Sequence, residues 1–221
     1  ISNGCRDHEL ASARKMLNMG ADAIVLSGAD QHEELSDILE RRRVPAVHTS
    51  LWQLHGKRPT IGYDNAGLAS AAIAYLESRG HHNIAIVHGP IHESDRTQAR
   101  RDGAIASTGP NTRLHFVETI ADVAGGKKAV GSVLQRSIRP SAILCFTDTL
   151  ALGAYFALQE AGLSIPGDMS VMGFDNLDWS SQIHPPLTTI NLPARRMGRH
   201  VAEKLIRHLD DGEPIGSTLL M

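Results

Sequence analysis

The stretch Asn83-Ile84-Ala85-Ile86-Val87-His88-Gly89-Pro90 decides the fold. Residues 84–87 are continuously apolar and rich in β-branched side chains, which is typical of a strand buried on both faces of a parallel sheet. A strand with one wet face would instead alternate apolar and polar residues. Further apolar stretches of this kind occur at residues 23–26, 44–47, 142–146 and 170–172. The sequence therefore predicts a sheet of buried, parallel strands.

Segments with helical periodicity separate these strands. In residues 64–79, the side chains expected on one buried face are Leu68, Ala72, Tyr75 and Leu76. Asp64 is placed to cap the start of this helix and Gly80 to end it. Pro193 opens another helix, whose expected buried side chains are Met197, Val201, Leu205 and Leu209. Alternating strands and helices predict a doubly wound α/β architecture with right-handed crossovers.

Composition narrows the class of protein. The 221 residues are 42% hydrophobic and 21% charged, which is ordinary for a globular protein, and the formal net charge is -2. This charge gives no basic footprint for nucleic acid within the segment. The two cysteines, Cys5 and Cys145, lie far apart, which argues against a disulfide framework and fits a reducing cytoplasm. No apolar stretch approaches the ~20 residues of a membrane span, and no signal peptide is visible. We expect a cytoplasmic protein that does not bind membranes.

The two ends of the sequence resemble interrupted strands. The chain begins at Ile1 rather than at a methionine, and residues 218–221 form an apolar stretch that stops abruptly. We therefore expect this chain to be part of a longer protein.

Small residues and carboxylates follow the predicted strands. Examples are Ser27 after the first strand, Thr147-Asp148 after the fourth and Asp175-Asn176 after the fifth. In doubly wound sheets, ligands bind outside the carboxyl ends of the strands. These residues predict a pocket for a polar, hydroxyl-rich ligand.

Several segments, taken in order, closely resemble the effector-binding core of the lactose/galactose repressor family, and the resemblance extends over essentially the whole chain. They are Gly80-His81-His82-Asn83-Ile84-Ala85, Arg100-Arg101-Asp102-Gly103, Thr147-Asp148 through Leu152-Gly153-Ala154, Ile165-Pro166-Gly167-Asp168-Met169-Ser170-Val171, Gly173-Phe174-Asp175-Asn176 and Pro185-Pro186-Leu187-Thr188-Thr189-Ile190.

The resemblance implies a periplasmic binding protein-like fold of type I, in which three crossing strands join two doubly wound parallel-sheet lobes. The crossings are expected near residues 89–91, 190–192 and 213–215. The amino-terminal lobe would then comprise residues 1–90 and 192–213, without its first strand and helix. The carboxyl-terminal lobe would comprise residues 91–191 and 214–221. The DNA-binding head of the family is absent from this chain.

The resemblance also implies ligand contacts. Arg100 matches the family's effector-binding arginine, with a surface helix arginine as the alternative, and its donors suit sugar hydroxyls or a carboxylate. Asp175 matches a carboxylate that accepts from ligand hydroxyls, with a turn or helix cap as the alternative. Thr147 replaces an asparagine of the family. The following Asp148 is expected to cap the next helix rather than to contact ligand. Three more positions have weaker support: Asp64, which is equally a helix cap; Ser94, in a loop; and Ala121, where some relatives place a ring.

Association is expected as well. The helix from Leu150 to Glu160 is apolar nearly all round, which is more than one buried face requires. In the family, this helix and the region after Asp178 contribute to a homodimer. The residues expected at such an interface are Leu150, Tyr155, Leu158, Trp179 and Ile183.

Metal, cofactor and catalytic motifs are not found. The twelve histidines show no metal-ligand spacing, and the glycines lack the spacing of phosphate or dinucleotide loops. No serine lies in a nucleophile elbow, and no cysteine has an obvious base. We expect no cofactor, no metal and no enzymatic activity.

The function implied is that of the effector-sensing domain of a bacterial transcription repressor. It would bind a sugar, polyol or sugar acid between its lobes and couple binding allosterically to the affinity of a homodimer for operator DNA, through the absent head. Two alternatives stay open: a periplasmic sugar-binding protein of an importer, and a small α/β enzyme acting on a sugar or nucleoside.

Overall fold

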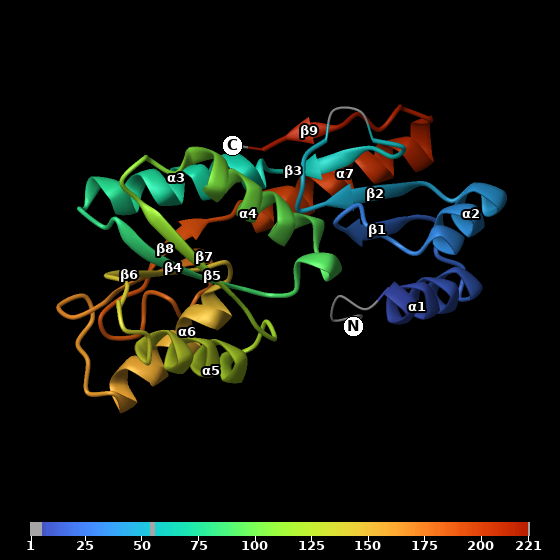
Figure 1. Cartoon of the computed structure of the whole chain (residues 1–221). Helices are drawn as coiled ribbons and strands as arrows, with labels where there is room; N and C mark the ends of the chain where they lie inside the picture. Colours follow the sequence, from blue (N-terminus) through green and yellow to red (C-terminus); the bar gives the residue numbers. More distant parts are fainter. Residues whose placement is uncertain (1–5, 54–55, 221) are drawn as a thin grey trace. The chain divides into compact units, whose positions relative to one another are not determined.

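The computed structural model describes residues 6–53 and 56–220 (Figure 1). Cys5 and the ends of the chain at residues 1–4 and 221 lie outside this range. The described chain divides into two compact units. The first contains the residues up to Asp64, Glu93–Arg96 and the residues from Pro193 onward. The second contains Asn65–His92 and Thr97–Leu192. Within the described residues, no helix is long and apolar enough to cross a bilayer.

The first unit contains a parallel sheet with the strand order β1-β2-β3-β9. Its strands are β1 (Ile24–Ser27), β2 (Ala46–Thr49), β3 (Thr60–Gly62) and β9 (Thr218–Leu219). The strands predicted at residues 23–26 and 44–47 correspond to β1 and β2. Every residue of β2 and β3 is buried, as expected for strands covered on both faces.

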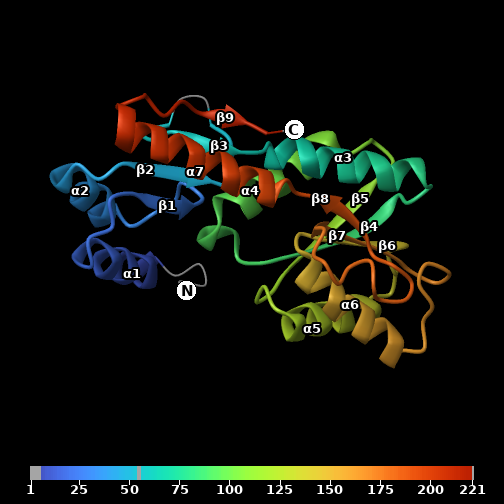
Figure 2. The ribbon, with the colours of Figure 1, turned by 180° about the vertical axis from the view of Figure 1, so that it is seen from behind.

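Helices cover both faces of this sheet. On one face, α1 (Arg6–Asn18) and α2 (Glu33–Arg42) pack with Ala46 of β2 in one apolar cluster. On the other face, α7 (Ala194–Asp211) packs Val201 and Leu205 against Val47 and Ile61 (Figure 2). The sequence predicts this helix correctly, except that Leu209 is 48% exposed. Leu209 lies one turn beyond the sheet contact of Leu205.

The second unit contains a parallel sheet with the strand order β5-β4-β6-β7-β8. Its strands are β4 (Asn83–His88), β5 (Arg113–Glu118), β6 (Ala142–Cys145), β7 (Ser170–Asp175) and β8 (Thr188–Asn191). The stretch at residues 83–90 contains β4, which pairs with strands on both sides. The edge strands β5 and β8 are only half-buried, which explains their more polar sequences.

Two pairs of helices cover this second sheet. In Figure 1, α3 (Asn65–Ser78) and α4 (Asp95–Ser107) lie on one face, while α5 (Val123–Leu134) and α6 (Asp148–Glu160) lie on the other. A short 3₁₀ helix, η1 (Ile91–Glu93), precedes α4. The predicted helix at 64–79 corresponds to α3, and Gly80 ends it with a left-handed φ of 86°. Tyr75, expected on the buried face, is 40% exposed because it sits at the rim of that face, where the guanidinium of Arg79 lies 5.3 Å from its ring.

Helices α5 and α6 pack at close range. A Cβ on Gly153 of α6 would lie 2.3 Å from the carbonyl oxygen of Val123, and one on Gly126 of α5 would lie 2.4 Å from that of Leu150. Helix α6 therefore has apolar contacts on two sides, the sheet and α5. This packing within the chain explains why its sequence is apolar nearly all round.

The boundary between the units differs from the sequence-based expectation. Residues 65–90 were expected in the amino-terminal lobe, but β4 bonds to β5 and β6 and lies near the centre of the second sheet. The chain therefore enters the second unit after Asp64 rather than near residues 89–91. The last strand also differs, since residues 214–221 were expected in the carboxyl-terminal lobe and β9 pairs with β3 of the first sheet.

Candidate functional site

The candidate site lies at the point where strand order reverses in the second sheet. The chain passes from β4 to β5 on one side and then returns to place β6 on the other side of β4. Such a switch point is where open α/β sheets bind ligands, outside the carboxyl ends of the strands. Here β4 ends at His88 and is followed by Gly89, and β6 is followed by Phe146-Thr147.

Four rings form a row across these strand ends. The ring centroids of Phe116 and His88 are 6.0 Å apart, those of His88 and Phe146 are 5.9 Å apart, and those of Phe146 and Phe174 are 5.9 Å apart. The row follows the strand order β5-β4-β6-β7. Two successive arginines of α4 cover its ends, with Arg101 over Phe116 at 4.9 Å and Arg100 over Phe174 at 4.4 Å.

Arg100 is buried, with 6% of its surface exposed. Its Nε donates to Oδ1 of Asn65 at 2.9 Å, and its Nη1 donates to the carbonyl oxygen of Phe146. These bonds and the contact with Phe174 fix the plane of the guanidinium. The alternative of a surface arginine is therefore wrong. Asn65, the buried first residue of α3, was missed by the sequence analysis.

Asp175 ends β7 beside this arginine. Its φ is 122°, a backbone conformation that costs a non-glycine residue about 1–3 kcal/mol and that is common at functional sites. Burial raises the pKa of Asp175 to about 6, the positive charge of Arg100 opposes the rise, and the nearby Asp148 adds to it. The carboxyl group therefore changes its charge close to neutral pH. Arg100 and Asp175, predicted together as ligand contacts, lie in one unit at one edge of one sheet.

Asp148 has a different role from the one expected. Its Oδ1 accepts from Oγ1 of Thr189 at 2.6 Å, and its Oδ2 accepts from the backbone N–H of Leu177 at 2.9 Å. Burial raises its pKa, and these hydrogen bonds lower it. A Cβ on Gly173 would lie 2.3 Å from Oδ1 of Asp148. Asp148 is thus a buried brace that ties β7, β8 and the loop after Asp175 together.

Thr147, not Asp148, is the cap of α6. Its hydroxyl oxygen accepts from the backbone N–H of Leu150 at 3.2 Å. The expected cap is therefore corrected by one residue, because Asp148 is already the first residue of the helix and points to β8. A ligand contact by Thr147 stays a prediction.

The other candidate positions are divided between the units. Ala121 lies near Gly89, which follows β4. A Cβ added to Gly89 would lie 3.1 Å from the Cβ of Ala121. It therefore belongs to the same edge as Arg100 and Asp175. Asp64 is exposed directly before α3, and Ser94 is half-buried directly before α4. Both belong to the first unit, and their ligand contacts stay predictions.

The residues expected at a dimer interface are mostly internal. Leu150 and Leu158 have 0% of their surface exposed, so they contribute no surface to a partner, and their inclusion is corrected. Tyr155 is 8% exposed, and its hydroxyl donates to the carbonyl oxygen of Pro185 at 3.1 Å. Trp179 and Ile183 are half-buried against the same core. On α6, Phe156 is 42% exposed.

Other chemistry finds no support in the described residues. Within them, no cluster of three His, Cys, Asp or Glu side chains could hold a metal ion. Cys145 is fully buried, and burial raises the pKa of its thiol, which disfavours the reactive thiolate.

A parallel α/β sheet with a fixed arginine and an ionisable carboxyl group at its carboxyl edge is typical of proteins that bind small molecules. Residues 73–221 match the family described as "Periplasmic binding protein-like domain". Catabolite control protein A of Priestia megaterium is 29% identical, with 97% of this chain and 66% of the relative covered. The HTH-type transcriptional repressor PurR of Aliivibrio fischeri is 30% identical, with 90% and 60% covered. A structure of a LacI family transcriptional regulator from Enterococcus faecium with bound ribose has a TM-score of 0.85 and 25% identity, covering 96% of this chain and 80% of that one.

The chain belongs to the periplasmic binding protein-like domain family, and its relatives are LacI-family transcription regulators. The resemblance to the lactose/galactose repressor family and the fold class predicted from the sequence are both confirmed. The chain spans between 60% and 66% of the length of the two curated relatives named above.

Proposed function

We propose that this chain is the effector-sensing part of a bacterial transcription repressor and that it binds a sugar, polyol or sugar acid at the carboxyl edge of the second sheet. One observation supports this most strongly: Arg100, fixed by Asn65 and Phe146, lies beside the strained, half-buried Asp175. The regulator from Enterococcus faecium with bound ribose supports the class of ligand.

The chemistry of the pair suits a polyhydroxylated ligand. An ionised Asp175 accepts hydrogen bonds from hydroxyl groups, while a guanidinium donates to hydroxyl or carboxylate oxygens. Because Arg100 is already held in place, little rotamer freedom is lost when a ligand binds.

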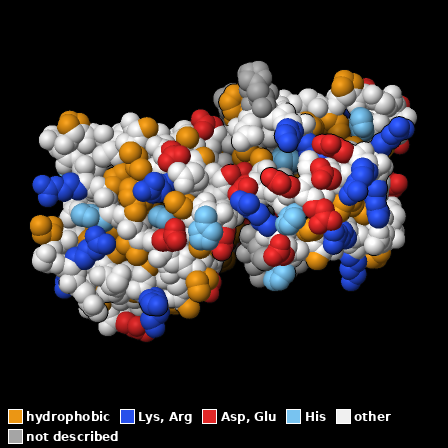
Figure 3. All heavy atoms as spheres, turned by 45° about the vertical axis from the view of Figure 1, so that its right-hand side comes forward, with side chains coloured by type: hydrophobic (Ala, Val, Ile, Leu, Met, Phe, Trp, Pro, Cys, Tyr) orange, Lys and Arg blue, Asp and Glu red, His pale blue; other side chains and the backbone are white. Residues whose placement is uncertain are grey.

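The effector acts by shifting the equilibrium between conformational states of the protein. In the intact protein, ligand would favour the state that binds it more tightly, with a coupling of about 1–3 kcal/mol to operator affinity. Operator contacts belong to a DNA-binding head outside this chain. On the face shown in Figure 3, Lys and Arg side chains are interspersed with Asp and Glu side chains rather than gathered into one basic surface. The protein acts in the cytoplasm and has no enzymatic activity.

The functional unit is a homodimer in this proposal. The exposed side of α6, rather than its buried leucines, supplies the contact. Phe156, Leu152 and Ile183 line a groove of about 450 Å³ in the second unit. Two-fold symmetry of such a dimer would match palindromic operators.

A thermal-shift screen of neutral sugars, sugar acids and polyols tests the proposed function. A ligand that binds only the folded state raises the melting temperature by mass action. We expect at least one sugar-class compound to do so in the wild type and to lose this effect in Asp175→Asn. An equal shift in both proteins would contradict the assigned site.

A further inference from the structure

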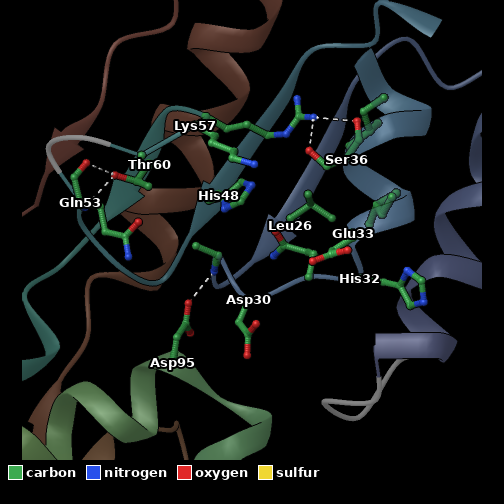
Figure 4. Close-up of a pocket in the computed structure, with 16 residues that line it drawn as sticks. Leu26, Asp30, His32, Glu33, Ser36, His48, Gln53, Lys57, Thr60 and Asp95 are labelled. Atoms are coloured by element: carbon green, nitrogen blue, oxygen red, sulfur yellow. Dashed lines mark hydrogen bonds between the residues drawn. The ribbon is translucent and has the colours of Figure 1, made fainter. Parts of the chain in front are cut away.

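The first unit contains a pocket that the proposed function does not use. Its volume is about 520 Å³, within the range of small-molecule sites. It lies between α2, the ends of β1 and β2 and the segment before β3 (Figure 4). The apolar side chains that line it are Leu26, Ala29, Leu35 and Leu39.

A buried imidazole faces this pocket. His48 is 8% exposed, and within the described part of the chain its Nε2 has no hydrogen-bond partner. A buried polar atom without a partner costs about 1–3 kcal/mol. His48 pairs with Leu26 across the β1–β2 register, and both side chains line the pocket. The unsatisfied nitrogen therefore points to a ligand.

Two of the three acidic groups that line the pocket have partners within the protein, and the third, Glu33, is exposed. Asp30 forms an ion pair with Arg6. One oxygen of Asp95 accepts from the backbone N–H of Ala29 at 2.6 Å, and the other lies 3.4 Å from the guanidinium of Arg96. These carboxylates are therefore neutralised within the protein and provide little attraction for a cationic ligand.

The pocket is also lined by basic side chains. Figure 4 shows Lys57 and His48 on one side of the pocket, with Asp30 and Asp95 at its opposite end. Arg58 donates to the carbonyl oxygen of Ser36 at 3.1 Å and is held there. Beside it, burial and the charge of Arg58 lower the pKa of His48, so the imidazole is neutral and has one N–H to donate. The ammonium of Lys57 and this N–H are two donors that the pocket lining offers to a ligand.

We propose that this pocket binds a small organic carboxylate, with the carboxylate against Lys57 and His48 and the apolar body against Leu26, Leu35 and Leu39. A single lysine with a neutral imidazole matches one negative charge better than the two of a phosphate. The pocket is a second effector site, separate from the sugar-class site of the second unit.

Isothermal titration with benzoate, and with neutral benzamide as its isostere, tests this site. Benzoate binds the wild type and binds Lys57→Gln and His48→Leu at least about tenfold more weakly, as expected for loss of a charge-assisted hydrogen bond. Lys128→Gln, an exposed lysine of the second unit, leaves the affinity unchanged. During titration of the wild type, the imidazole ¹⁵N resonances of His48 shift. Because Lys57 lies in a connecting segment, its variant decides the result even if His48→Leu does not fold.

Other outcomes overturn the proposal. The proposal is wrong if benzoate does not bind the wild type, if benzamide binds as tightly as benzoate, or if inorganic phosphate binds more tightly than benzoate. It is also wrong if Lys57→Gln binds benzoate with unchanged affinity. Asp175→Asn separates this site from the proposed function, since the variant loses the sugar response and keeps the affinity for benzoate.

Discussion

The guanidinium of Arg100 lies 4.4 Å from the ring centroid of Phe174, whose next residue is Asp175. The arginine thus contacts the strand that carries the carboxylate while its other atoms bond to Asn65 and Phe146. The same side chain therefore stabilises the unit and prepares the site for ligand.

Replacing Arg100 with lysine separates the effect of the guanidinium contacts from the effect of the positive charge. Arg100→Lys keeps the charge but loses the planar contact with Phe174 and the bond to Asn65. We expect a loss of about 1–3 kcal/mol in the free energy of unfolding and a weaker sugar response. Urea denaturation measures the first and calorimetric titration the second. The matched control is Arg101→Lys, because Arg101 covers Phe116 in the same way. Equal effects of the two variants would contradict the special role of Arg100.

The stability of the protein should depend on pH through Asp175. Its pKa is raised from 3.8 to about 6 in the folded protein, so the folded state holds its proton more tightly than the unfolded chain. The stability this provides is complete below pH 4 and is lost as the pH rises through about 6. Asp175→Asn cannot lose a proton, so at pH 7 we expect it to be more stable than the wild type by about 2–3 kcal/mol. Unfolding curves at pH 4 and pH 7 check this, and the same difference at both pH values would refute it.

Ligand affinity should show the opposite pH trend. An ionised Asp175 is the acceptor for ligand hydroxyls, so affinity should fall as the pH is lowered through about 6. Titrations between pH 5 and pH 8 measure this trend. An affinity that is flat over this range would exclude Asp175 as the acceptor.

Two glycine substitutions should change the stability of the protein in opposite directions. Gly173→Ala places a Cβ 2.3 Å from Oδ1 of Asp148, and we expect it to destabilise the protein by about 1–3 kcal/mol because the brace must move. Gly131→Ala in α5 meets nothing within 4 Å and should stabilise by up to about 1 kcal/mol through helix propensity. Thermal denaturation of both variants gives the comparison. A tolerated Gly173→Ala would show that Asp148 is not fixed.

Dimerisation should depend on the exposed side of α6. Phe156→Asp puts a charge into the groove that Phe156 lines, and we expect sedimentation equilibrium to show a shift toward monomer. Ile105→Asp, at a residue of similar exposure on α4, is the control. Equal association of the two variants would place the interface elsewhere.

The buried strands could be predicted from the sequence because their pattern is local. Residues 84–87 and 142–145 are continuously apolar, and both form central strands. The assignment of β4 to the second sheet could not be predicted, because strand pairing depends on partners that are distant in sequence. For the same reason, the sequence could not show that packing within the second unit buries Leu150 and Leu158 of α6.

Some residues of the candidate site could be predicted from the sequence, and others could not. Arg100 and Asp175 could be found because their neighbours resemble a known family. Asn65 and the brace formed by Asp148 could not be found, since their roles consist of hydrogen bonds to residues 29 or more positions away. His48 gave no signal in the sequence, because its significance depends on the apolar wall of the pocket that surrounds it.

A crystal structure with the sugar-class compound that gives the largest thermal shift tests the central claim most directly. We expect ligand hydroxyl oxygens within hydrogen-bond distance of the Asp175 carboxylate and ligand oxygens within hydrogen-bond distance of the Arg100 guanidinium. A ligand bound elsewhere, with neither side chain in contact with it, would contradict the account.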